Sequence, residues 1–298
     1  MTAPQIFDRA LIRRRLARAE RAGAADFLIS HVAADLVDRL SPIKRSFALA
    51  VELGGVTSHG ARALARSGRV ESVIRLAALP PRKAGGPPTA VADEEALPLA
   101  EASVDLVLSL LTLQAANDLP GALAQIRRSL RPDGLFVACV LGGETLGELR
   151  QSFAAAELET AGGASPRVAP FADARELGTL MQRAGFALPV TDIERLAVRY
   201  SDPIALMRDL RAMGMANPIA ERSRRPLRRA TLARAAEIYG ERFADPDGRL
   251  RATFELVWLT GWAPDAGQQQ PLRPGSAKTR LADALGVVEI GTGEKAKP

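Results

Sequence analysis

Short apolar runs alternate with amphipathic helical patterns along the first half of this 298-residue chain. Apolar runs of strand length predict strands at 47–53, 70–76, 90–92, 104–109 and 135–141, of which the first is expected to be buried. Helical spacing occupies two of the intervals, 60–67 and 119–130. Strands and helices that alternate over short connections are typical of an α/β protein with a doubly wound, mostly parallel sheet.

The flanking parts of the chain have a more helical pattern. Apolar spacing predicts helices at 8–22, 27–40, 144–160, 173–184, 202–213 and 230–242, with further strands at 190–200 and 253–262. We therefore expect five consecutive parts. They are an N-terminal helical segment (1–45), an α/β core (46–200), a helical cap (201–250), the last sheet strand (251–265) and a C-terminal tail (266–298).

The chain is basic, with a formal net charge of +6 and a pI near 10.0. This charge favours contact with acidic proteins, phosphates or an anionic membrane surface, although many solvated proteins are as basic. Two arginine-rich sets could dock an acidic partner or simply face solvent: Arg13, Arg14, Arg15, Arg18 and Arg21, and Arg222, Arg224, Arg225, Arg228 and Arg229. Aromatic residues make up 4% and are not interleaved with the arginines, so no nucleic-acid partner is expected.

Metal and disulfide chemistry have few candidate residues. Cys139 is the one cysteine and lies in an apolar run, while His31 and His59 are the two histidines. We therefore expect no metal site. The start of the chain has no secretory pattern and no apolar run reaches 18 residues. The expectation is a cytoplasmic protein without a transmembrane segment, for which peripheral membrane contact is compatible with the charge.

The end of the first predicted strand has features of a ligand loop. Glu52 ends the strand, and Gly54 and Gly55 follow it. A carboxylate there can hold backbone amides or a cofactor ammonium group, and glycines let the backbone approach a ligand closely. The alternative is a tight turn between strand and helix.

A second acidic segment follows the third predicted strand. Ala92, Asp93 and Glu94 begin the run Ala92-Asp-Glu-Glu-Ala-Leu-Pro98. The Asp93 carboxylate could accept from the exocyclic amine of an adenine, or it could be an acid at a helix N-terminus. The second strand, however, ends at Arg75, a cation where a ribose-binding carboxylate is usual.

Together these segments resemble the class I S-adenosylmethionine-dependent methyltransferases. The resemblance rests on Val51-Glu-Leu-Gly-Gly55, Ala92–Pro98, Val104-Asp-Leu-Val-Leu108 and Ser129-Leu-Arg-Pro-Asp-Gly-Leu-Phe136. It implies a seven-stranded sheet with an antiparallel last strand. It also implies S-adenosyl-L-methionine as cofactor, bound by Glu52, Gly54, Gly55, Ala92, Asp93 and Glu94. No catalytic residue can be assigned, because methyl transfer needs mainly orientation of the two reactants.

A narrower resemblance extends over nearly the whole chain. Several segments are similar to the mitochondrial complex I assembly factors that are arginine hydroxylases, and to the related malonyl-acyl-carrier-protein O-methyltransferases. They include Ile6-Phe-Asp-Arg9, Asn117-Asp-Leu-Pro120, Gly142–Arg150 and Asp209-Leu-Arg-Ala-Met-Gly214. Three positions depart from the methyltransferase pattern, namely Val56 and Ser58 at glycine positions and Arg75 at the ribose position. A His-Trp pair is replaced by Gln114-Ala115.

The resemblance implies a methyltransferase-like enzyme that acts on a protein or carrier-protein substrate and is linked to respiratory complex I assembly, with a complex I subunit as candidate partner. Two alternatives stay open. One is an arginine hydroxylase of the same fold, and the other is a non-catalytic assembly factor with a degenerate cofactor site.

Overall fold

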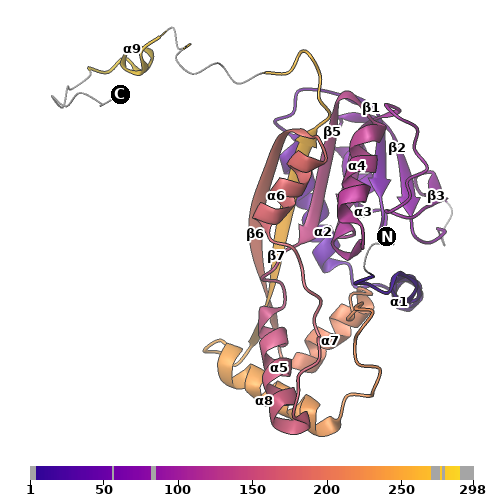
Figure 1. The fold of residues 1–298 in the computed structure, drawn as a ribbon, viewed down its shortest axis with the longest axis vertical. Helices are drawn as coiled ribbons and strands as arrows, with labels where there is room; N and C mark the ends of the chain where they lie inside the picture. Colours follow the sequence, from indigo (N-terminus) through magenta and orange to yellow (C-terminus); the bar gives the residue numbers. More distant parts are fainter. Residues whose placement is uncertain (1–4, 56, 82–84, 270–275, 277–278, 289–298) are drawn as a thin grey trace. The chain divides into compact units, whose positions relative to one another are not determined.

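The computed structural model describes residues 5–55, 57–81, 85–269, 276 and 279–288. The chain divides into two compact units, residues 1–264 and 265–298. The first unit contains the sheet and the helices packed on it (Figure 1). The described part of the second unit includes the short helix α9 (Leu281–Leu285). Val56 and parts of the expected tail lie outside the described residues.

Seven strands form one sheet in the order β3-β2-β1-β4-β5-β7-β6. Their bounds are β1 (Phe47–Leu53), β2 (Val70–Ala77), β3 (Thr89–Val91), β4 (Val104–Leu110), β5 (Leu130–Leu141), β6 (Ala187–Tyr200) and β7 (Leu250–Trp262). Neighbouring strands from β3 through β5 are parallel, whereas β7 runs antiparallel to both β5 and β6. The expected seven-stranded, mostly parallel α/β sheet with an antiparallel last strand is therefore confirmed.

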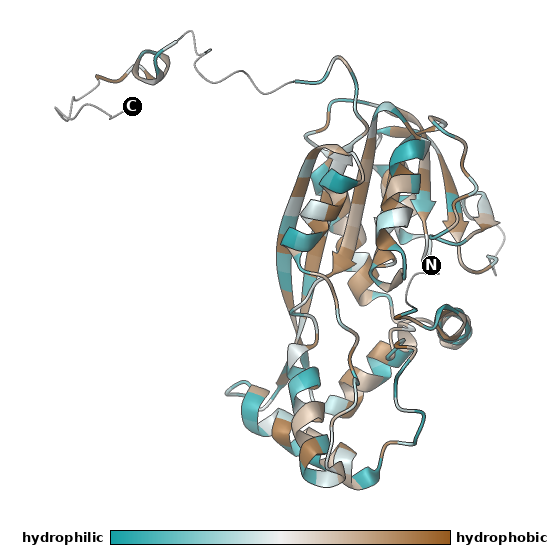
Figure 2. Ribbon diagram, viewed as in Figure 1, coloured by the Kyte–Doolittle hydropathy of each residue, from teal (hydrophilic) through white to brown (hydrophobic). Residues whose placement is uncertain are grey.

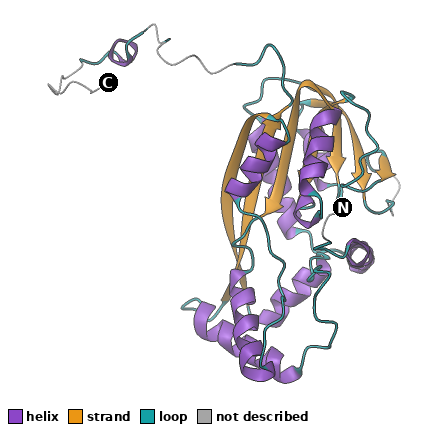
Figure 3. Ribbon diagram, in the orientation of Figure 1, coloured by secondary structure: helices purple, strands orange, loops and turns teal. Residues whose placement is uncertain are grey.

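Helices cover both faces of the sheet, as Figure 3 shows. Their bounds are α1 (Arg9–Ala22), α2 (Phe27–Leu40), α3 (His59–Arg66), the 3-10 turn η1 (Leu113–Ala115), α4 (Leu119–Ser129), α5 (Gly147–Ala161), α6 (Ala174–Arg183), α7 (Pro203–Ala212) and α8 (Arg229–Phe243). One apolar cluster joins α2 and α3 to the sheet, and a second joins α4 and α6.

Strand alternation assigns buried residues to the two clusters. Leu106 and Leu108 of β4 belong to the first cluster, whereas Val107 belongs to the second. Because successive side chains of a strand point to opposite faces, a strand that is apolar throughout needs helices on both sides. Figure 2 shows the matching distribution, with apolar colours along the sheet and polar colours on the outer sides of α4 and α6.

The strand β5 begins five residues earlier than its apolar run. Leu130 pairs with Val104, and the register then shifts before Leu135 pairs with Leu106. The turn-forming residues at 131–134 are accommodated as an irregularity within the strand. A Cβ at Gly134 would lie 2.8 Å from the carbonyl oxygen of Arg131, so a glycine is needed where the strand bends.

Helices α5, α7 and α8 lie beyond the carboxyl ends of the parallel strands (Figure 1). Thr160 of α5 and Thr231 of α8 share a hydrogen bond of 2.8 Å between their hydroxyl groups. These three helices lie at the edge of the sheet where ligands bind in folds of this kind. The division of this unit into an N-terminal segment, a core and a cap stays a prediction.

Candidate functional site

Glu52, at the carboxyl end of β1, is paired inside the protein. It lies opposite Arg75 of β2 in the sheet register, and Nε of Arg75 donates to its Oε2 at 2.6 Å. Both residues are buried. Burial raises the pKa of the Glu52 carboxyl, and the Arg75 guanidinium and the amides of Ala61 and Gly60 offset part of this effect. The carboxylate therefore binds the Arg75 side chain and the backbone amides at the start of α3. Binding of backbone amides is one of the two roles expected for it.

The two loop glycines have left-handed backbone conformations. Their φ angles are 84° at Gly54 and 75° at Gly55. The Gly54 amide donates to the Leu76 carbonyl oxygen at 2.6 Å, and a Cβ at Gly54 would lie 2.3 Å from Cγ2 of Thr112. The loop is thus packed against the residues that follow β4, and Arg75 secures it from the other side through Nη2 to the Thr57 carbonyl oxygen at 2.6 Å.

The acidic segment after β3 is bound by arginines of α1. Nη2 of Arg9 donates to Oδ1 of Asp93 at 2.9 Å and also to Oε2 of Glu94, while Arg13 donates to Oδ2 of Asp93. Burial opposes ionisation of Asp93, but the Glu95 amide and the two arginines outweigh it and lower its pKa. The backbone N–H of Ala92 continues the strand pairing by donating a hydrogen bond to the Ala77 carbonyl oxygen at 3.0 Å. Asp93 therefore begins a turn, not a helix.

Local contacts hold α1 in this position. Asp8 caps the helix by accepting from the Leu11 amide at 2.9 Å. The amide of Phe7 donates to Oδ1 of Asn117 at 2.7 Å, and the Asn117 side chain donates back to the Phe7 carbonyl oxygen at 3.1 Å. Sequence reasoning assigned Arg13 to a solvated face or a partner surface and did not pair it with Asp93, because the two residues are 80 positions apart.

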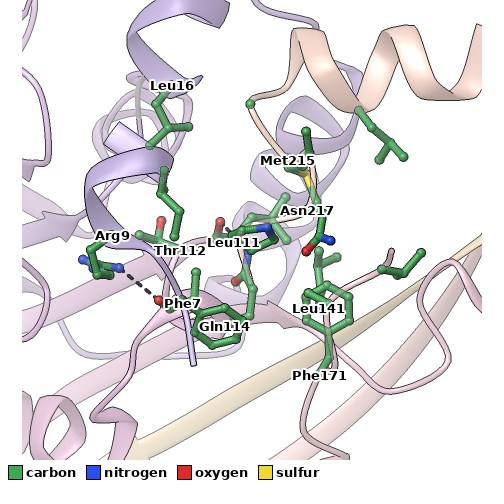
Figure 4. A pocket seen from close by; sticks show the side chains of 18 of the residues that line it. Phe7, Arg9, Leu16, Leu111, Thr112, Gln114, Leu141, Phe171, Met215 and Asn217 are labelled. Carbon is green, nitrogen blue, oxygen red and sulfur yellow. Dashed lines mark hydrogen bonds between the residues drawn. The ribbon is translucent and has the colours of Figure 1, made fainter. Parts of the chain in front are cut away.

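A cavity of about 160 Å³ lies between α1, the carboxyl edge of the sheet and the segment after α7. Its wall is mostly apolar, and Figure 4 shows Leu16 and Arg9 of α1 on one side and Met215 and Asn217 on another. Gly55 and Glu94 from the predicted cofactor site also line it. A dry engineered cavity of about 150 Å³ accommodates benzene, so this volume suits one side chain or small group.

Gln114 contributes an unsatisfied polar atom to this wall. Its Nε2 donates to the Leu111 carbonyl oxygen at 2.7 Å. Its Oε1 is buried and has no hydrogen-bond partner among the described residues. A buried acceptor without a donor is unfavourable unless a ligand supplies the missing hydrogen bond. Gln114, at the position of the methyltransferase His-Trp pair, thus lines the cavity and carries a buried, unpaired acceptor.

The site fits S-adenosyl-L-methionine in part. The cavity adjoins the glycine loop. The carboxylates of Asp93 and Glu94, predicted to bind the adenine amine, are bonded to Arg9 and Arg13 in this structure. The ribose end does not fit the usual pattern, since the residue at the acceptor position is Arg75 and it is bonded to Glu52. Arg75 points toward Glu52 and Thr57, and the cavity is lined by other residues.

The two histidines are paired with different carboxylates. His31 contacts Glu194 at 2.7 Å, and His59 contacts Asp26 at 3.3 Å. Within the described ranges, no group of three or more His, Cys, Asp or Glu side chains could hold a metal ion. Over the same residues, no helix has both the length and the apolarity required to cross a bilayer.

This sheet order, glycine loop and edge cavity define a protein of the class I methyltransferase fold. Residues 51–138 match a family model described as "Methyltransferase domain". The YcgJ protein from Bacillus subtilis has the same fold, with a TM-score of 0.52 and 13% identity over 79% of this chain and 99% of that one.

The chain belongs to the family of the arginine hydroxylase NDUFAF5. It is 39% identical to "Arginine-hydroxylase NDUFAF5, mitochondrial" of Danio rerio over 290 residues, which cover 93% of this chain and 89% of that protein. It is also 36% identical to the malonyl-[acyl-carrier protein] O-methyltransferase of Halorhodospira halophila, over 87% of this chain and 89% of that protein. These matches confirm the resemblance that the sequence motifs indicated and support S-adenosyl-L-methionine as the cofactor.

One expectation from the sequence is wrong. The start of the chain and the lack of a long apolar run led to an expected cytoplasmic location, whereas the NDUFAF5 relatives are mitochondrial proteins. A hydropathy pattern reports whether a segment could enter a bilayer and carries little information on the compartment of a folded protein.

Proposed function

We propose that this chain modifies one side chain of a protein substrate by S-adenosyl-L-methionine-dependent methyl transfer, in a step linked to respiratory complex I assembly. The observation that supports this most is the apolar cavity of about 160 Å³ beside Gly55 and Glu94. Its size suits a single side chain, and its position beyond the strand ends is where the fold binds ligands.

The residues of the chain would divide the work of binding and orientation. The Glu52–Arg75 pair keeps the glycine loop in shape, and Asp93 and Glu94 would hold the adenine edge of the cofactor. When bound, the cofactor supplies an activated methyl group. Oε1 of Gln114 would accept a hydrogen bond from an N–H of the substrate side chain and so fix its orientation. Orientation of this kind accounts for most of what a methyltransferase must provide.

Hydroxylation of an arginine side chain is the second candidate, because the NDUFAF5 relatives are named for it. An arginine side chain would bring several N–H donors to Gln114 and an aliphatic stem to the apolar wall. A non-catalytic assembly factor is the third candidate. It is favoured by the internal ion pairs that Glu52 forms with Arg75 and that Asp93 forms with arginines of α1.

Calorimetric titration with S-adenosyl-L-methionine tests the cofactor site. We expect binding by the parent protein and its loss in Asp93→Ala, with Glu101→Ala, an exposed carboxylate, as the control. Binding that is equal in all three proteins would contradict the assigned site. No binding in the parent protein would favour the assembly factor.

Mass spectrometry of a respiratory complex I subunit incubated with the protein then identifies the reaction. A mass increase of one methylene group that requires S-adenosyl-L-methionine supports methyl transfer. An increase of one oxygen atom on an arginine would replace methyl transfer with hydroxylation.

A further inference from the structure

A second cavity, of about 260 Å³, is lined by three arginines. Arg15 and Arg18 come from α1, and Arg211 comes from the last turn of α7. Gly214 and Ala216 complete the wall. The cavity is therefore built where α1 packs on the turn after α7, and a Cβ at Gly214 would lie 2.8 Å from Cδ2 of Leu16.

Arg15 is held in place while part of its guanidinium stays available. Nη1 donates to the Ala216 carbonyl oxygen at 2.7 Å and to that of Asn217. Both bonds use the same nitrogen, so within the described part of the chain Nε and Nη2 remain for a ligand. A guanidinium anchored through one edge presents the other as a preorganised pair of donors.

The three arginines at this cavity lack ion-pair partners within the part of the chain that the structure describes. Among the described residues, no carboxylate forms an ion pair with Arg15, Arg18 or Arg211. The carboxylate of Asp8 acts on Arg15 electrostatically, but it is itself paired with Arg222 at 3.3 Å. Burial and the neighbouring Arg222, Arg18 and Arg14 lower the pKa of Arg15, as expected for a cation among cations.

The arginine cavity shares a wall with the apolar cavity. Gly214 and Ala216 line both of them, and Leu16, which lines the apolar cavity, lies next to Arg15. A ligand that fills both would combine a small or apolar group with an anionic group a short distance away. Converging arginines are the usual receptor for carboxylate and phosphate oxygens, because their planar donors match these oxyanions in pairs.

We propose that Arg15, Arg18 and Arg211 form an oxyanion-binding subsite, which takes a carboxylate or phosphate group of the molecule whose side chain or small group enters the apolar cavity. The assignment to the substrate rests on the proposed function, whereas oxyanion binding at the three arginines does not. The two can therefore fail separately.

Binding of inorganic phosphate and of citrate, measured by calorimetry at constant ionic strength set with chloride, tests the subsite. Arg18→Ala and Arg211→Ala should each weaken binding about tenfold, the value of one lost charge-assisted hydrogen-bond pair. Arg224→Ala removes one charge from an exposed loop outside the cavity and is the matched control. Tighter binding of phosphate would indicate a ligand with a phosphate group, and tighter binding of citrate would indicate a ligand with a carboxylate group.

Several outcomes would overturn the proposal. One is the absence of saturable binding by the parent protein. Another is equal weakening by Arg18→Ala, Arg211→Ala and Arg224→Ala, which would indicate general attraction of anions to the basic surface. Binding of the parent protein and the same variants to vesicles of anionic lipid provides a further comparison. Vesicle binding without phosphate or citrate binding would replace the subsite with a membrane surface. Arg18 and Arg211 are both exposed. Arg211→Lys, which keeps the charge and loses the paired donors, should also weaken binding if the subsite is correct.

Discussion

Glu52 and Arg75 form a buried ion pair between neighbouring strands, with 2.6 Å between Oε2 and Nε. The pair occupies the positions where this fold usually binds the cofactor's methionine end and ribose. Each partner also bonds to the backbone beyond its strand, Glu52 at the start of α3 and Arg75 at Thr57. Arg75, which departs from the methyltransferase pattern, therefore has a structural role in this chain, since it binds Glu52 and the loop after β1.

Removing one member of this pair should destabilise the protein strongly. Arg75→Ala leaves the Glu52 carboxylate buried without its cation, and loss of one partner of a buried pair typically costs about 3–5 kcal/mol. Urea denaturation measures the change. Glu101→Ala breaks an exposed pair with Arg128, whose atoms lie 3.5 Å apart, and should have little effect. Similar midpoints for the two variants would show that the buried pair contributes little.

Gly60 should not tolerate a methyl group. A Cβ there would lie 2.4 Å from Oε1 of Glu52, because the carboxylate packs directly on the first turn of α3. Gly60→Ala should therefore destabilise the protein by about 1–3 kcal/mol, the usual effect of overpacking. Gly147, at the start of α5, has no atom within 4 Å of an added Cβ. Gly147→Ala is the matched control, expected to be neutral or slightly stabilising in the same thermal melt. Equal melting temperatures would be inconsistent with the close packing of Glu52.

Gln114 should matter to activity more than to stability. Gln114→Met removes the unpaired Oε1 together with one hydrogen bond to Leu111, so these effects on stability should largely cancel. Modification of the protein substrate should fall about tenfold or more, the effect of one lost orienting hydrogen bond. Gln125, whose amide bonds to Leu97 and Glu95, is the control, since Gln125→Met should lower stability. Full activity in Gln114→Met would remove the role assigned to Oε1.

Arg13 should compete with the cofactor for Asp93. Arg13 is partly exposed and bonds to Oδ2 of Asp93. Releasing that oxygen in Arg13→Ala should tighten S-adenosyl-L-methionine binding by up to about fivefold, the upper range for an exposed ion pair. Arg14→Ala removes a neighbouring charge that makes no ion pair among the described residues, and should leave the titration unchanged. Weaker binding in Arg13→Ala alone would mean that Arg13 contacts the cofactor.

Stability should fall as the solution is acidified through the titration of His59. Burial and the nearby Arg62 lower the pKa of this histidine from its ordinary value of 6.5. Below 6.5 the unfolded chain therefore binds a proton that the folded protein does not, so unfolding becomes more favourable as pH falls toward the folded-state pKa. The denaturant midpoint of the parent protein should be lower below pH 6.5 than above it. This difference should become smaller in His59→Gln. An unchanged pH dependence in His59→Gln would assign the effect to other groups.

Hydrophobic patterning along the chain predicted the α/β class and the mostly parallel sheet, whereas the antiparallel last strand was implied by the resemblance to the methyltransferases. The apolar runs from Phe47 to Leu141 correspond to observed strands. The pattern is clearest in the central strand β4, which is buried along its whole length, because burial on both faces favours apolar residues at successive positions. The same local reasoning located the loop at Glu52 and the acidic segment at Asp93, since both follow directly from strand ends. It did not predict the turn that Asp93 begins, because a helix N-terminus was the structural alternative considered there. It placed the start of β5 too late, because the pairing of Leu130 with Val104 outweighs the turn preference of residues 131–134.

The partners of the charged groups could not be predicted in this way. Arg9 and Arg13 reach Asp93 across 84 and 80 positions of sequence, and Arg18 and Arg211, which line the same cavity, are separated by a still longer interval. Periodicity reports which face of a helix is polar, but an ion pair depends on where another element places its opposite charge. The shape of the cavities and the availability of Asp93 and Glu94 for a ligand therefore arise from how α1 packs on the strand ends.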